Sequence, residues 1–152
     1  MTQFAVIEAS RRHCGQIARK LRVEHETGSR SVIKFGTHEG ISVAFLMSSD
    51  NRAWMIDGKL AAVGGLITTF ASSDGVIWLA VAQEATRYPK AMLKTAREWL
   101  GVFGENKRAL RITVILADKP SVRFAEHLGF YPTGEVSDDD KMAVMQLNCG
   151  GG

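Results

Sequence analysis

The chain has 152 residues, of which 45% are hydrophobic and 23% charged, a size and composition typical of one soluble globular domain. No apolar run approaches the roughly 20 residues that a membrane-spanning helix needs, so we expect no such span. The first residues lack a basic leader followed by a long apolar stretch, so we expect no secretory signal. The net charge of +3 is mildly basic, and the cations within residues 11–22 are followed at once by Glu24 and Glu26. This pattern favours a solvated helix face over a nucleic-acid interface.

The two cysteines, Cys14 and Cys149, lie near opposite ends of the chain. A disulfide between them stays open, but two unclustered cysteines are more typical of free thiols in a reducing compartment. Neither has another Cys or a His at metal-ligand spacing, so the sequence predicts no metal site.

The first third of the chain predicts one strand and two helices. Phe4–Glu8 is short and apolar, which favours a buried strand, and Ser10 is suited to cap the helix that follows. One face of that helix carries apolar residues at helical spacing, namely Cys14, Ile17, Ala18 and Leu21. Residues 26–30 form a break. Gly36–Ser49 contains a continuous apolar run whose periodicity does not separate helix from strand, and its length favours helix.

The middle of the chain predicts a hairpin. Ala53–Ile56 is one strand, Asp57-Gly58 is a strong turn signal, and Lys59–Phe70 is the returning strand. Gly64-Gly65 lies inside the returning strand and indicates a bulge or a close approach of another backbone.

A further turn at Ser72–Gly75 leads into the strand Val76–Val81. Pro89 fits the first turn of a helix, where its missing N–H costs little. Gly101 and Gly104 mark the expected end of that helix. Its apolar stripe consists of Met92, Leu93, Ala96, Trp99, Leu100 and Phe103.

The last third predicts a strand, a short helix and a final hairpin. Leu110–Ala117 is the strand, Asp118 is a good N-cap, and the helix within Ser121–Phe130 ends at Gly129. The hairpin runs from Tyr131 to Leu147. We therefore predict a single domain over residues 1–147 with a flexible Gly-rich tail over residues 148–152.

The complete order, β-α-α-β-β-β-α-β-α-β-β, predicts an α/β (α+β) fold. An antiparallel meander followed by a crossover helix implies a mixed, mostly antiparallel sheet of six to seven strands, with helices on both faces.

Three segments carry a resemblance to a known family: AWMIDGKLAAVGG at residues 53–65, IWLAVAQEATRYPKAMLKTAREWL at residues 77–100, and SVRFAEHLGF at residues 121–130. With the order of elements, they make nearly the whole chain resemble the GNAT superfamily of acyl-CoA-dependent N-acetyltransferases. TRYPKAMLKTAR looks more narrowly like the GNAT-like proteins of tailed bacteriophages, some of which are internal virion proteins and others acetyltransferases.

The resemblance implies a cofactor and a place for it. In the family the strand at Trp78–Val81 splays from the strand at Leu110–Ala117, and the opening admits the pantetheine arm of acetyl-CoA. The N-terminus of the following helix binds the pyrophosphate, since exposed N–H groups and the helix dipole favour anions there. Carried onto this chain, the implied cofactor-binding residues are Leu79, Val81, Arg87, Lys90, Ala91 and Asp118.

The sequence departs from the enzyme pattern at several positions. Pro89 takes the first glycine slot of the phosphate-binding loop and removes an N–H donor, whereas Ala91 at the second slot is an accepted variant. Arg87 and Lys90 either compensate with charge or are solvated residues beside a proline-started helix. Ala125 stands where many members have a tyrosine that protonates the leaving thiolate.

Two further departures concern carboxylates. Asp118 replaces a common asparagine, so we expect it to serve mainly as an N-cap, because its charge would repel CoA phosphates. Glu84, just past the Trp78–Val81 strand, is the candidate catalytic residue and would relay a proton from the amine through water. His127 is expected to be solvated, and His38 carries little weight.

Two functions follow from the resemblance. The first is a phage-encoded N-acetyltransferase whose partners are acyl-CoA and an amine acceptor. The alternative is a non-catalytic GNAT-like protein with a degenerate cofactor loop, which contacts virion or host proteins. Either would reside in the host cytoplasm or the virion, and a homodimer is among the expected assemblies.

Overall fold

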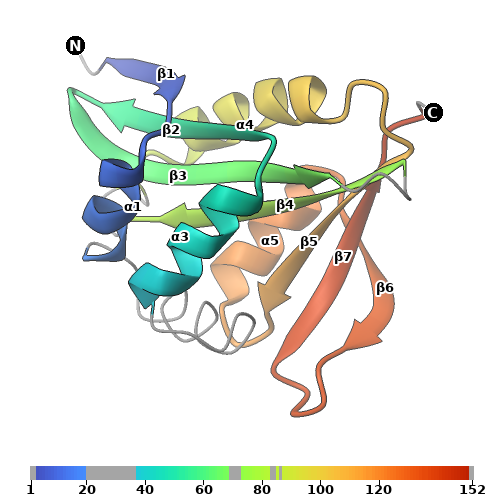
Figure 1. The fold of residues 1–152 in the computed structure, drawn as a ribbon. Coiled ribbons are helices and arrows are strands. Elements are labelled where there is room, and N and C mark those ends of the chain that lie inside the picture. Colours follow the sequence, from blue (N-terminus) through green and yellow to red (C-terminus); the bar gives the residue numbers. More distant parts are fainter. Residues whose placement is uncertain (1–2, 20–36, 69–72, 83–84, 86, 151–152) are drawn as a thin grey trace. The chain divides into compact units, whose positions relative to one another are not determined.

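The computed structural model describes residues 3–19, 37–68, 73–82, 85 and 87–150 (Figure 1). Its elements follow the predicted order: β1 (Phe4–Glu8), α1 (Arg11–Ala18), α3 (Thr37–Met47), β2 (Asp50–Ile56), β3 (Lys59–Thr68), β4 (Asp74–Val81), α4 (Pro89–Phe103), β5 (Ala109–Ile115), α5 (Lys119–His127), β6 (Tyr131–Val136) and β7 (Met142–Asn148).

The strands form one seven-stranded sheet in the order β1-β2-β3-β4-β5-β7-β6. β4 and β5 are parallel, whereas β1–β2, β2–β3, β5–β7 and β6–β7 are antiparallel pairs. The predicted mixed, mostly antiparallel sheet is therefore confirmed.

The contacts of the chain divide it into two compact units. The N-terminal unit comprises Met1–Ile67 and Trp78–Pro89, and the C-terminal unit comprises Thr68–Ile77 and Lys90–Gly152. β4 contributes its first half to the C-terminal unit and its second half to the N-terminal unit.

The N-terminal unit is built on the meander β1–β2–β3, with α1 and α3 in contact with each other (Figure 1). The predicted helix within Gly36–Ser49 is confirmed as α3, and Ser10 is confirmed as the N-cap of α1. Small side chains dominate the core and let the elements approach closely. The buried cluster consists of Ala9, Cys14, Ile17, Ile41, Ala53, Leu60, Val63, Ala80 and Ala82.

The hairpin between β2 and β3 turns at Asp57 and Gly58, whose φ angles are 50° and 77°. Positive φ at both positions is the requirement of the predicted two-residue turn. On β3, a Cβ added at Gly65 would lie 2.6 Å from Trp78 Nε1 and 2.8 Å from the carbonyl oxygen of Asp50. Of the two expectations for Gly64-Gly65, the close approach is confirmed.

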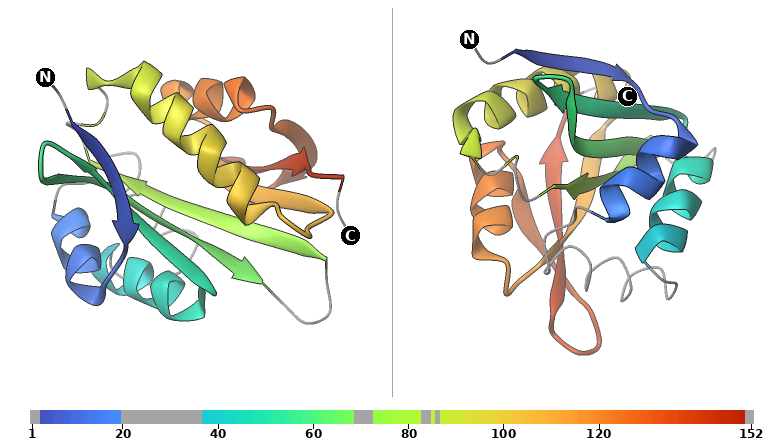
Figure 2. Two further views of the ribbon diagram at one scale, coloured as in Figure 1. Left: turned by 90° about the horizontal axis from the view of Figure 1, so that it is seen from above. Right: turned by 90° about the vertical axis from the view of Figure 1, so that its left-hand side faces the viewer.

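In the C-terminal unit, α4 and α5 lie on the same side of the sheet (Figure 2). Arg97 of α4 donates a hydrogen bond from Nη2 to the carbonyl oxygen of His127 at the end of α5, at 3.2 Å. α5 also contacts β5, and Leu110, Ala125 and Phe130 are buried.

The structure corrects some expectations. β1 is an exposed edge strand rather than a buried one, with Phe4 and Ile7 about 40% exposed, because it pairs with β2 alone. The predicted turn at Ser72–Gly75 is wrong for Asp74 and Gly75, which begin β4. Their parallel pairing with β5 draws them into the sheet.

The C-terminal ends of α4 and β7 also differ from the predicted ends. Gly101 lies inside α4 rather than at its end, because the apolar stripe continues through to the buried Phe103. β7 runs through Asn148, and the N–H of Cys149 donates to the carbonyl oxygen of Arg108 at 2.9 Å. The start of the predicted tail is therefore hydrogen-bonded.

Leu21, residues 26–30, the end of the predicted strand at residues 69–70 and the side chain of His38 lie outside the described residues. Among the helices that are described, none has the length and apolar character needed to cross a membrane.

Candidate active site

The second half of β4 divides its side chains between two faces, as strand geometry requires. Trp78 and Ala80 pack with the core that includes α1 and α3 residues. Leu79 and Val81, two of the predicted cofactor-binding residues, are half-buried and alternate with them. Beyond the strand, the N–H of Ala82 donates to the carbonyl oxygen of Ala61 at 2.8 Å, which holds the end of β4 against β3.

The connection from β4 to α4 is held by alanines and an aromatic contact rather than by glycines. The Ala85 N–H donates to the carbonyl oxygen of Ala82 at 3.2 Å, and the Tyr88 N–H donates to that of Ala85 at 3.1 Å. The Tyr88 ring meets Phe4 of β1 edge to face, with centroids 5.5 Å apart. Sequence analysis missed this contact, whose signal is a tyrosine directly before the helix-starting proline.

The N-terminus of α4 presents two backbone donors. Four N–H groups at a helix start have no partner within the helix. Here Tyr88 directs its N–H to Ala85, and Pro89, confirmed in the first turn, has none. Among the residues that the structure describes, no acceptor is found for the N–H groups of Lys90 and Ala91. Arg87 and Lys90, which are close to these groups in the sequence, have exposed side chains, and such cations near a helix start suit an anion.

The N-terminus of α5 is closed by its own cap. Asp118, only 2% exposed, accepts hydrogen bonds from the Ser121 N–H at 3.4 Å and from the Ser121 hydroxyl at 2.5 Å. The predicted N-cap is confirmed. Its role in cofactor binding stays a prediction.

The end of α5 is fixed by backbone geometry. Gly129 has φ +101°, its N–H donates to the carbonyl oxygen of Glu126, and the Phe130 N–H donates to that of Ala125. This pair of bonds is a Schellman motif, which confirms that Gly129 ends the helix. Ala125, at the position where many GNAT members have a tyrosine, is 4% exposed.

The hydroxyl of Tyr131, two residues after Gly129, donates a hydrogen bond to Asn148 Oδ1 at 3.1 Å.

The other residues singled out in the sequence have different positions in the structure. Glu84 lies outside the described residues, so its catalytic role stays a prediction. His127 is exposed, as expected. Cys14 and Cys149 are both free thiols, and burial raises the pKa of each, which keeps them protonated at neutral pH. Leu79, Val81 and Arg87 belong to the N-terminal unit, whereas Lys90, Ala91 and Asp118 belong to the C-terminal unit.

An open groove of about 500 Å³ lies in the C-terminal unit, away from the two helix starts. Its walls are the last turns of α4 and the ends of α5 and β7, including Leu100, Leu128, Leu147 and Cys149. None of the predicted site residues lines it.

No protein-family model matches the chain, and no curated protein does. Solved structures match over nearly its whole length. A spermidine N-acetyltransferase chimera from Vibrio cholerae and hSSAT is 12% identical, with 97% of this chain and 96% of that chain covered and a TM-score of 0.73. A GNAT-family acetyltransferase from Bacillus anthracis is 10% identical, with 96% and 95% covered and a TM-score of 0.67.

A candidate acetyltransferase from Salmonella typhimurium, solved with its cofactor acetyl-CoA, is 11% identical, with 96% and 94% covered and a TM-score of 0.67. At identities this low the likeness shows the fold alone. That fold is the one shared by these GNAT-type acetyltransferases.

Proposed function

We propose that the chain is an acyl-CoA-dependent N-acetyltransferase that uses acetyl-CoA and an amine acceptor. One observation carries the proposal: on a fold shared with acetyltransferases, α4 begins with two N–H donors, at Lys90 and Ala91, that have no acceptor among the described residues, and the side chains of Arg87 and Lys90 are exposed. Backbone donors and cations at a helix start are what a pyrophosphate requires.

The residues present fit the cofactor with a reduced set of donors. Pro89 removes one N–H from the helix start, and Ala91 keeps its own. The guanidinium of Arg87 offers several donors in one plane, and the ammonium of Lys90 is a compact charge. We therefore propose that side-chain charge replaces part of the backbone donation.

When bound, acetyl-CoA supplies an activated acyl thioester. The chain contributes binding through Arg87, Lys90 and Ala91, and we propose that Leu79 and Val81 of β4 line the path of the pantetheine arm. Glu84 is proposed to take a proton from the amine through a water molecule, as a general base placed just past β4.

Isothermal titration calorimetry with acetyl-CoA tests binding, and acyl transfer to a panel of amines tests activity. Because one matching structure is a spermidine N-acetyltransferase chimera, polyamines are the first acceptors to try. We expect a dissociation constant in the range of about 1 μM to 1 mM. No heat at millimolar acetyl-CoA would refute the proposal.

The proton relay has its own test. Glu84→Gln should lower kcat with little change in acetyl-CoA affinity, and should remove the acidic limb of the pH–rate profile. An unchanged pH–rate profile would show that Glu84 takes no part in the proton transfer.

A second candidate is a non-catalytic GNAT-like protein of a phage, carried in the virion or directed at host proteins. Ala125 favours it, because a buried alanine occupies the position where many members have a tyrosine proton donor. Mass spectrometry of purified virions tests the first form, and a pull-down from host lysate tests the second. A failure to bind acetyl-CoA would favour this non-catalytic function.

A further inference from the structure

One edge of the sheet ends in β1, and within the described part of the chain no strand lies on its other side. The ladder with β2 shows which backbone groups face outward. The Asp57 N–H donates to the carbonyl oxygen of Gln3 at 2.8 Å, and this bond continues the register of the β1–β2 pairing. Residues that bond to the neighbouring strand alternate along an antiparallel ladder. Phe4, Val6 and Glu8 therefore direct their N–H and C=O groups away from β2.

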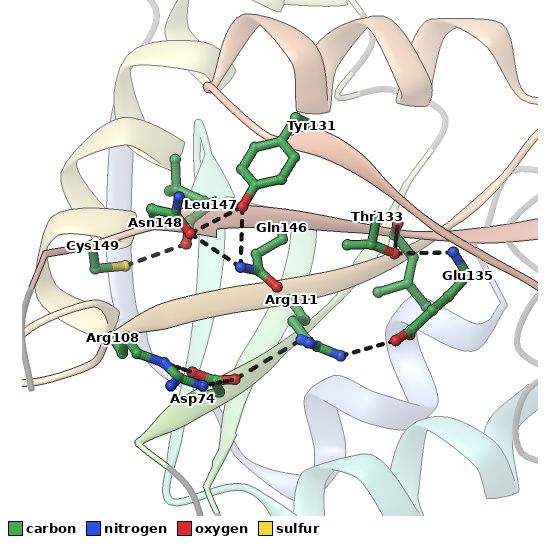
Figure 3. Close-up of polar contacts among 11 residues, drawn as sticks. Asp74, Arg108, Arg111, Tyr131, Thr133, Glu135, Gln146, Leu147, Asn148 and Cys149 are labelled. Carbon is green, nitrogen blue, oxygen red and sulfur yellow. Dashed lines mark hydrogen bonds and ion pairs between the residues drawn. The ribbon is translucent and has the colours of Figure 1, made fainter.

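The other edge strand, β6, is protected against pairing with a further strand. Pro132 has no N–H, and the register with β7 shifts between Pro132 and Val136. The Glu135 N–H donates to Thr133 Oγ1 at 3.2 Å, and the Thr133 hydroxyl donates to the carbonyl oxygen of Val144 at 3.0 Å (Figure 3). Irregularities of this kind, and a proline, are how proteins blunt the edges of their sheets.

β1 has none of these irregularities. Its five residues include no proline or glycine, and its pairing with β2 continues through all of them without a register shift. The side chains of Phe4 and Ile7 are 40% and 42% exposed. Its one charged residue, Glu8, lies at the end of the strand. A regular and largely apolar edge of this kind is suited to accept another strand.

We propose that this edge pairs with β1 of a second copy of the chain, antiparallel about a two-fold axis at Val6. In this register Val6 faces the partner subunit's Val6, and Phe4 faces the partner subunit's Glu8. Facing residues of this type exchange two hydrogen bonds, so all the outward N–H and C=O groups of Phe4, Val6 and Glu8 gain partners. The contact is self-complementary, as a two-fold interface requires.

The side chains favour the same register. Ala5 faces the partner subunit's Ile7, so a small side chain lies opposite a large one, and two β-branched valines meet at the axis. The two Glu8 carboxylates lie at opposite ends of the paired strands, so like charges do not face each other. A shift by two residues would leave Phe4 or Glu8 without a facing residue in β1. A second copy thus satisfies the whole edge and needs no other protein.

The interface is small, which sets the expected affinity. A stable protein–protein interface buries about 1,200–2,000 Å², and pairing two five-residue strands buries less. We therefore expect a reversible dimer with a dissociation constant of about 10–100 μM. This assembly does not depend on acetyltransferase activity, so either proposal can fail without the other.

Sedimentation velocity on the full chain at about 1–300 μM tests the proposal. The wild type should pass from the 16.6 kDa monomer to a dimer within this range. Val6→Lys and Val6→Glu should each raise the dissociation constant at least about fivefold, because two like charges then face each other at the axis. An equimolar mixture of the two variants should return it to within about threefold of the wild type, since opposite charges then meet.

Val136→Lys is the matched control, because it makes the same change at an exposed valine of the protected edge β6. It should leave the dissociation constant unchanged. Circular dichroism confirms that each variant folds. A wild type that stays monomeric at the highest concentration would overturn the proposal, as would an equal loss in Val136→Lys. A mixture that does not restore the dimer would exclude a two-fold axis at Val6 and overturn it as well.

Discussion

Two helices begin in opposite ways. α5 begins with Asp118, whose buried carboxylate accepts hydrogen bonds from the N–H and the hydroxyl of Ser121. α4 begins with Pro89, has no carboxylate in its first turn, and leaves the N–H groups of Lys90 and Ala91 without a partner in the helix. One helix start is satisfied by the chain itself, and the other has two N–H groups for which the described residues supply no acceptor.

The two helix starts therefore suit different roles, one in stabilising the fold and the other in binding a ligand. A satisfied N-cap stabilises the fold and has no donor left to offer. An open helix start costs stability and makes sense where a ligand supplies the missing acceptor. The resemblance gave Asp118 and Lys90 the same cofactor-binding role, whereas the geometry gives them different surroundings.

The first expected effect is a loss of stability at the capped start of α5. Asp118→Ala should lower the free energy of unfolding by about 1–2 kcal/mol, because the Ser121 N–H and hydroxyl lose a buried acceptor. Urea denaturation measures it. Asp118→Asn is the control, since asparagine caps about as well, and it should restore most of the stability.

The same pair of variants tests the predicted cofactor role. If Asp118 is only a cap, Asp118→Asn should leave acetyl-CoA affinity unchanged or slightly improved, because a negative charge is removed near the phosphates. A marked loss of acetyl-CoA affinity in a stable Asp118→Asn protein would show that Asp118 takes part in cofactor binding and is not only a cap.

The open start should respond in the opposite sense. Pro89→Ala restores one backbone N–H and keeps a good helix former at the first position. A hydrogen bond to a charged group contributes about 1.5–3 kcal/mol, so acetyl-CoA affinity should rise about tenfold or more. Calorimetry measures the gain. Unchanged affinity would show that the helix start does not contact the pyrophosphate.

The cations beside the open start should have a smaller effect. Arg87→Ala and Lys90→Ala should each weaken acetyl-CoA binding about 3- to 10-fold, and more at low salt, because exposed charges are screened. Lys59→Ala, on the β2–β3 hairpin, is the control. Losses no greater than the control would favour the solvated alternative for both residues.

Much of the fold was predictable because its signals are local. Asp57-Gly58, Pro89, Asp118 and Gly129 each have a backbone requirement that sequence displays directly, and each was placed correctly. β1 was misjudged because an edge strand and a buried strand can have the same apolar composition.

The site was harder to predict because its parts are distant in sequence. Whether a donor at the start of α4 is free depends on where Tyr88 directs its N–H, and that depends on Ala85. The match of Asp74 to Arg108 likewise appears only when β4 and β5 pair. Residue identity indicates which groups exist, but the packing decides which are already used.

A third helix start sharpens the comparison, because its acceptor titrates. At α1, the Ser10 N–H donates to His13 Nδ1 at 2.9 Å, and His13 is 7% exposed. Burial, and then the charge of Arg12, lower the pKa of His13 below its ordinary value of 6.5. The unfolded chain therefore binds this proton at a higher pH than the folded chain does.

The stabilisation is thus complete above about pH 6.5 and is lost as the pH falls through the lowered pKa of His13. Urea denaturation between about pH 5 and pH 7.5 should show this decline in the wild type. His13→Gln keeps an acceptor suited to this position but does not titrate, so the decline should be smaller in this variant. Parallel curves for the two proteins would contradict the prediction, because they would show that the decline does not come from the loss of the bond at Nδ1 when that nitrogen becomes a donor.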